Sequence, residues 1–168
     1  MKSLSSLHFP LRAGLHRILG HQAVFVPELG NKVVGYPTWS LSLAQDEKVQ
    51  TIFPASKGSV ASVGKALGNH TTLYKYLNPR LFVILTEAPL VSPTTCGVYL
   101  VDSTKGSVVY RASVPATSGI CDVKASLTEN WLVYHYYEEF AGVGQAKGYR
   151  MVSVELYEGS QVDDKTSR

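Results

Sequence analysis

Short apolar segments separated by polar turns dominate the first half of the chain. Residues 24–36 place two apolar segments around Gly30 and Asn31, which readily adopt the positive φ of a tight hairpin. Residues 39–53 repeat this plan, with apolar and polar side chains alternating on either side of a polar turn. The pattern predicts two successive β-hairpins, followed by a Gly-, Ser- and Ala-rich connection over residues 54–69 that contains one short strand.

The second half contains two similar units about fifty residues apart, a spacing in the range of propeller blades. Residues 77–83 align with residues 127–133. Each of these apolar strands is followed, after a loop, by a second strand, at 97–102 in one unit and 150–155 in the other. The strand, loop, strand plan is therefore repeated.

The first unit continues into a hairpin over residues 98–110, with the form V-x-L-V-D-x-x-x-G-x-V-x-Y. Asp102 can accept hydrogen bonds from the turn, and Gly106 is free to adopt a left-handed conformation. This form resembles the outer hairpin of quinoprotein-type propeller blades. An ordinary antiparallel meander in a sandwich is the alternative. We favour an all-β fold, a partial β-propeller of quinoprotein-like blades with antiparallel sheets.

Composition supports strands and argues against two classes of function. The ten tyrosines and the many Val and Thr residues suit a pleated sheet. The net charge is only +3 and the basic residues are scattered, so we expect no nucleic-acid partner. The longest apolar candidate, residues 81–85, is far short of the roughly 18 residues that a membrane-spanning helix needs.

No residue pattern indicates catalysis. The five histidines lack metal-ligand spacing, and residues 64–68 lack the Gly-Lys-Ser/Thr ending of a phosphate loop. Glu138 and Glu139 are adjacent, so in a strand they face opposite sides and cannot share a proton. We interpret them as a solvated loop edge, and we expect no catalytic residue, no cofactor and no metal.

The two cysteines, Cys96 and Cys121, are too few for a disulfide framework and show no CxxC spacing. Their spacing favours two buried or free thiols over a bridge or a metal site.

One motif has a covalent consequence. Asn69-His70-Thr71 is an N-x-T sequon in a polar loop, and it makes Asn69 a candidate for glycosylation if the chain enters the secretory pathway.

Three further blocks carry a resemblance. Lys75–Pro79 reads Lys-Tyr-Leu-Asn-Pro, Glu129–Trp131 reads Glu-Asn-Trp, and Glu155–Glu158 reads Glu-Leu-Tyr-Glu. In this order and separation they resemble the C-terminal luminal region of subunit 1 of the endoplasmic reticulum (ER) membrane protein complex. The resemblance covers residues 73–159, and the first seventy residues share only general propeller character.

We expect the prominent residues of these blocks to maintain the fold. Asn78 bonds its own backbone and Pro79 fixes φ, so together they make a turn that directs the following strand into the sheet. Trp131 opens the equivalent strand and presents a large apolar face, whose loss should cost about 3 kcal/mol or more.

The resemblance implies a non-catalytic luminal scaffold at the ER membrane. Its implied partners are the other subunits of the complex and, indirectly, tail-anchored and multipass membrane proteins during insertion and folding. The chain departs from the family in lacking a convincing signal peptide, the earlier blades and a final membrane-spanning helix. We therefore expect a fragment, with membrane association through missing segments or partner subunits.

Two alternatives remain, a quinoprotein-like propeller enzyme and an unrelated propeller interaction module. An enzyme of the first kind needs carboxylates for Ca²⁺ and cofactor-facing aromatics from many blades. We divide the chain into a poorly matched hairpin region at 1–72, a blade at 73–124, and the start of the next blade with a polar tail at 125–168.

Overall fold

The computed structural model describes residues 6–10, 16–30, 32–88, 94–139 and 146–159. Within these ranges the regular structure is strand, apart from the short 3-10 helix η1. The elements are β1 (Ser6–Pro10), β2 (Arg17–Val26), η1 (Pro27–Leu29), β3 (Lys32–Ser42), β4 (Lys48–Pro54), β5 (Gly64–Ala66), β6 (Thr72–Tyr74), β7 (Leu81–Ala88), β8 (Thr95–Asp102), β9 (Ser107–Pro115), β10 (Lys124–Thr128), β11 (Trp131–Glu138) and β12 (Gly148–Glu155). No helix in this described part of the chain has the length and apolar character needed to cross a membrane.

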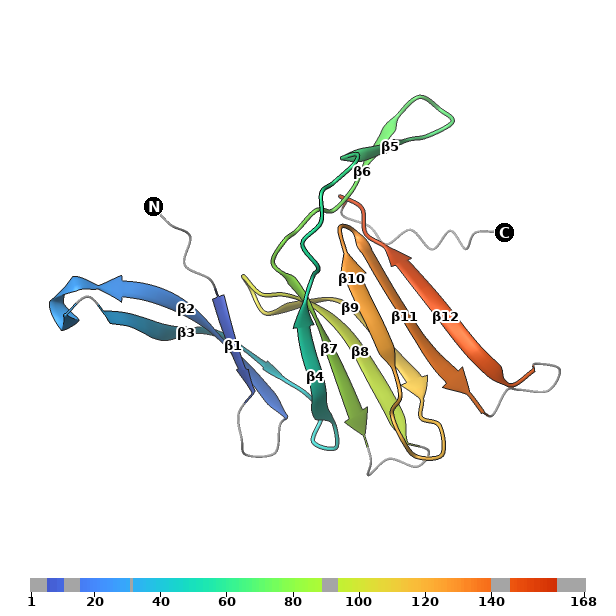
Figure 1. The fold of residues 1–168 in the computed structure, drawn as a ribbon, viewed down its shortest axis with the longest axis horizontal. Helices are drawn as coiled ribbons and strands as arrows, with labels where there is room; N and C mark the ends of the chain where they lie inside the picture. The colour runs from blue at the N-terminus through green and yellow to red at the C-terminus, as the bar shows by residue number, and fades with distance from the viewer. Residues whose placement is uncertain (1–5, 11–15, 31, 89–93, 140–145, 160–168) are drawn as a thin grey trace.

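The strands form three successive antiparallel sheets and a small projecting arm (Figure 1). The first sheet has the order β1-β2-β3, the central sheet β4-β7-β8-β9 and the third sheet β10-β11-β12. The arm is the two-stranded hairpin β5-β6, inserted between β4 and β7. The all-β prediction with antiparallel sheets is confirmed.

The two inner strands of the central sheet, β7 and β8, are buried on both faces, which explains why they read as nearly continuous apolar runs. Alternate residues of a strand point to opposite faces. Leu81 and Val83 therefore pack toward Leu127 and Leu132 of the third sheet. Phe82, Ile84, Tyr99 and Val101 pack on the opposite face, against Ile18 and Trp39 of the first sheet. Each fully buried side chain of this size stabilises the fold by about 1.5–3 kcal/mol.

The first predicted hairpin is confirmed and the second is wrong. β2 and β3 pair along their length, and Gly30 between them has a φ of 71°. β4, by contrast, pairs with β7 in another sheet and not with the preceding strand β3. The chain turns a corner between them because Leu41, Leu43 and Val49 are used for packing between the two sheets.

The fifty-residue repeat has a direct structural counterpart. β7 and β11 begin at Leu81 and Trp131, and each pairs with the strand that follows it, β8 or β12. The central sheet also takes β4 from before residue 72.

Candidate interaction surface

The three sequence blocks that are far apart in the chain meet at one end of the central and third sheets. We call this meeting point the motif junction, made of Lys75–Pro79, Glu129–Trp131 and Glu155–Glu158. The ammonium of Lys75 forms an ion pair with the Glu129 carboxylate at 3.1 Å, with both side chains largely buried.

Backbone bonds extend this contact. The N–H of Tyr76 donates to the carbonyl of Leu156 at 3.0 Å, and the N–H of Glu158 donates to the carbonyl of Tyr74 at 2.8 Å. Lys75 and Tyr157 form an antiparallel bridge between them. Backbone hydrogen bonds and this single bridge thus join the base of the arm to the segment that follows β12.

Asn130 is the most deeply buried residue of the junction, with 0% of its surface exposed. Its Nδ2 donates to the carbonyl of Leu156 at 3.0 Å, and the N–H of Leu156 donates back to the Asn130 carbonyl at 2.8 Å. Trp131, its neighbour, turns to the outer face of the third sheet and is 36% exposed. The sequence pointed to Trp131, whereas its neighbour Asn130 makes the buried hydrogen bonds to Leu156.

A second group of polar contacts joins the junction to the turn between β8 and β9. Nδ2 of Asn78 lies 3.0 Å from Oδ2 of Asp102 and 3.0 Å from the hydroxyl of Tyr76. Oδ1 of Asn78 accepts the N–H of Arg80 at 2.9 Å, the turn bond expected of this residue. Oδ1 of Asp102 likewise accepts the N–H of Thr104 at 2.7 Å. Pro79 lies exposed in the same turn.

The turn between β8 and β9 is held against the first sheet by Trp39. Its Nε1 donates to the carbonyl of Ser103 at 2.7 Å. Gly106 has a φ of +68°, and a Cβ placed on it would lie 2.5 Å from the Trp39 ring. Only glycine meets both demands at this position.

A buried carboxylate at the opposite end of the central sheet was not foreseen. Glu47, in the corner between β3 and β4, is 7% exposed and accepts hydrogen bonds from the hydroxyls of Tyr99 at 2.5 Å and Thr86 at 2.9 Å. Arg111 lies 3.6 Å from its Oε2 and 5.0 Å over the Tyr99 ring. Burial, followed by the bond to Glu47, raises the pKa of the Tyr99 hydroxyl well above its ordinary value. These groups satisfy one another, and the cluster fixes the corner.

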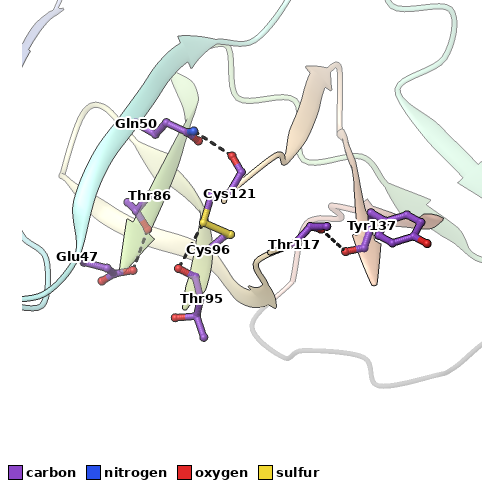
Figure 2. Close-up of a disulfide and its surroundings, with 8 residues drawn as sticks. All are labelled: Glu47, Gln50, Thr86, Thr95, Cys96, Thr117, Cys121 and Tyr137. Atoms are coloured by element: carbon purple, nitrogen blue, oxygen red, sulfur yellow. Dashed lines mark hydrogen bonds between the residues drawn. A yellow bond between two sulfur atoms is a disulfide. The ribbon is translucent and has the colours of Figure 1, made fainter. Parts of the chain in front are cut away.

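Cys96 and Cys121 form a disulfide, so the prediction of two thiols is wrong (Figure 2). Their Cα atoms are 5.6 Å apart. The reason is the antiparallel pairing of β8 with β9, which brings the chain back beside Cys96 before it reaches Cys121. The carbonyl of Cys121 also accepts a hydrogen bond from Gln50 of β4 at 3.0 Å.

The two adjacent glutamates are also bound more firmly than expected. Glu138 belongs to β11, and its Oε2 lies 2.6 Å from Nε of Arg150 on β12. Oε2 of Glu139 accepts the N–H of Ser118 at 3.1 Å. The prediction of a solvated loop edge is corrected, because both carboxylates bind neighbouring segments.

The outer face of the third sheet carries the most exposed large apolar side chains of the described residues. Tyr149 and Met151 on the edge strand β12 are each 76% exposed. The Tyr149 ring contacts those of Tyr137 and His135, with centroids 5.2 Å and 6.2 Å apart. With Trp131 at its other end, this face is a candidate contact surface.

The remaining predicted residue, Asn69, lies apart from all of these. It is exposed at the tip of the arm between β5 and β6. The structure therefore brings together Asn78, Asp102 and Gly106, whereas the Trp131 side chain faces outward from the third sheet and Asn69 lies at the tip of the arm. Within the described part of the chain, no group of three or more His, Cys, Asp or Glu residues is arranged to hold a metal ion.

Three successive antiparallel sheets, of which the central and third meet at the motif junction, define a segment of a β-propeller. A family model described as "ER membrane protein complex subunit 1, second beta-propeller" matches residues 2–168. The ER membrane protein complex subunit 1 of Xenopus laevis is 31% identical over 133 residues, which are 77% of this chain and 13% of the relative. The protein of the same name from Schizosaccharomyces pombe is 35% identical over 128 residues, which are 76% of this chain and 14% of the relative. The chain belongs to this family and matches only about one seventh of the length of these relatives.

Proposed function

We propose that this chain is a non-catalytic scaffold segment on the luminal side of the ER membrane protein complex. It contacts other subunits and thereby supports the insertion and folding of tail-anchored and multipass membrane proteins. The observation that carries the proposal is the motif junction, where the three blocks contact one another: Lys75, before β7, pairs with Glu129 of the third sheet, and Asn130 donates to the carbonyl of Leu156. These polar contacts hold the joined segments in one arrangement, which gives other subunits a defined surface to bind.

The disulfide between Cys96 and Cys121 supports the luminal side. Disulfides persist in oxidising compartments such as the ER lumen and are rare in the cytosol. The exposed apolar face around Tyr149 and Met151 supports a role in contacts with other protein surfaces.

The test is affinity purification of the tagged chain from its own cells, with insertion of a tail-anchored reporter measured in parallel. We expect the other subunits of the complex to be recovered with the unmodified chain and with Lys57→Ala, a control at an exposed residue. Asn130→Ala should lower chain abundance, recovery of the subunits and reporter insertion together. Trp131→Ala should have a smaller effect on abundance, since its ring is partly exposed.

Recovery of the chain without any other subunit would contradict the proposal. A variant of Glu138 or of a histidine that abolished insertion while the complex stayed intact would show a chemical role instead.

A further inference from the structure

The arm formed by β5 and β6 projects from the body of the protein and carries the sequon at its tip (Figure 1). Its base is held by the motif junction, where Lys75 and Tyr76 pair with the segment after β12. Asn69 and its neighbours from Gly68 to Thr71 are exposed. A Cβ placed on Gly68 would meet no heavy atom within 4 Å, so the tip has open space around it.

The sequon adopts a defined turn. The hydroxyl of Thr71 donates to Oδ1 of Asn69 at 2.6 Å, and the N–H of Thr71 donates to the same oxygen at 3.1 Å. His70 between them has a left-handed φ of 66°, which lets Thr71 fold back onto the Asn69 side chain. Because a backbone N–H is always a donor, the atom facing it must be the amide oxygen.

The amide nitrogen Nδ2 of Asn69 is consequently left available. Within the described part of the chain, the hydrogen bonds of this side chain all engage Oδ1. The position thus combines an exposed nitrogen, a hydroxyl bonded to the amide oxygen and space for a large hydrophilic group.

We propose that Asn69 carries an N-linked glycan, an inference that rests on the luminal placement proposed above. The co-reactant is a lipid-linked oligosaccharide diphosphate. A bond forms between Nδ2 of Asn69 and the anomeric carbon of the first sugar, and the bond from that carbon to the diphosphate oxygen breaks. The amide releases one proton to solvent, and the lipid diphosphate leaves with the bonding electron pair. The glycosylated tip faces solvent, so contacts with other subunits lie on other surfaces.

The chain is suited to a clean test because none of its other asparagines, Asn31, Asn78 and Asn130, begins an N-x-S/T sequon. The full chain, tagged and expressed in its own cells, is compared by electrophoresis before and after treatment with an amidase that removes N-glycans. We expect one mobility step that disappears in Asn69→Gln and Thr71→Ala and persists in Thr71→Ser. Thr72→Ala, one residue outside the sequon, should keep the step.

The state of the cysteines separates the two proposals in the same samples. Absence of the step in chain whose Cys96 and Cys121 resist alkylation until reduced would overturn glycosylation and leave the luminal placement standing. Absence of the step with both thiols free to react would overturn both proposals. A step that persists in Asn69→Gln would also overturn the assignment to this residue.

Discussion

Asn78 donates a hydrogen bond from Nδ2 to Oδ2 of Asp102 at 3.0 Å, which joins the turn before β7 to the turn after β8 through their side chains. Asp102 is almost fully buried, so loss of its partner leaves a carboxylate that water reaches poorly. Hydrogen bonds to charged groups contribute about 1.5–3 kcal/mol to stability, more than neutral ones.

We expect Asn78→Ala to lower the free energy of unfolding by about 1.5–3 kcal/mol, as measured by chemical denaturation. Asn78→Asp keeps an acceptor for the N–H of Arg80 but places a second negative charge beside Asp102. It should therefore destabilise the chain even though the turn bond remains. Equal stability of Asn78→Asp and the unmodified chain would show that the contact with Asp102 contributes nothing to the free energy of unfolding.

Two separate constraints, the left-handed backbone and the nearby Trp39 ring, require glycine at Gly106. The energetic cost of each can be measured separately. In Gly106→Ala the added Cβ is strained by the left-handed backbone and clashes with the Trp39 ring. The change should lower the free energy of unfolding by about 2–4 kcal/mol. Gly119 also has a positive φ, +79°, but nothing lies within 4 Å of its added Cβ. Gly119→Ala is thus a matched control for the backbone cost alone, about 1–2 kcal/mol.

A double-mutant cycle completes this test. Trp39→Ala removes the clash, so Gly106→Ala should cost less in that background. Strict additivity of the two changes would rule out the ring as the cause.

The disulfide closes a separation of 25 residues, and the entropy of the unfolded chain predicts a stabilisation of about 3.5 kcal/mol. Replacing Cys96 and Cys121 together by Ala should lower the midpoint of urea unfolding accordingly. Addition of a reductant should lower the midpoint of the unmodified chain but leave that of the variant unchanged. Identical midpoints for all samples would mean that the sheets hold this connection without the bridge.

The local features of the fold were predictable because they depend on neighbouring residues. Short stretches of sequence indicate the Gly30 hairpin, the hairpin that turns at Gly106 and the repeat that aligns Leu81 with Trp131. The family blocks were also recognisable from their order and spacing.

Features that depend on packing between sheets were missed. The segment 49–53 alternates as a hairpin strand would, and only its pairing with the distant strand β7 shows that it belongs to the central sheet. Cys96 and Cys121 become neighbours only through the register of β8 and β9. Glu47 lies in a polar segment typical of an exposed turn, and nothing local indicates that Tyr99 and Thr86 will enclose it.

The burial of Tyr99, together with its hydrogen bond to Glu47, predicts how stability changes in alkaline solution. The folded state raises the pKa of the Tyr99 hydroxyl above the value of about 10 that it has in an unfolded chain. A raised pKa means that the folded state holds this proton more tightly. The stabilisation is therefore fully present below pH of about 10 and is lost as the pH rises toward the folded-state pKa.

We expect the free energy of unfolding of the oxidised chain to fall as the pH rises above about 10, when followed by urea denaturation at a series of pH values. Tyr99→Phe removes both the hydroxyl and its proton, so this variant should be less stable at neutral pH by about 1.5–3 kcal/mol and should show a shallower alkaline decline.

Tyr134→Phe is the matched control, because Tyr134 is also buried with a raised pKa but bonds Tyr110 instead of a carboxylate. Its loss at neutral pH should be smaller than that of Tyr99→Phe, since a bond between neutral hydroxyls contributes less than a bond to a charged group. A decline as steep in Tyr99→Phe as in the unmodified chain would place the alkaline sensitivity elsewhere in the protein.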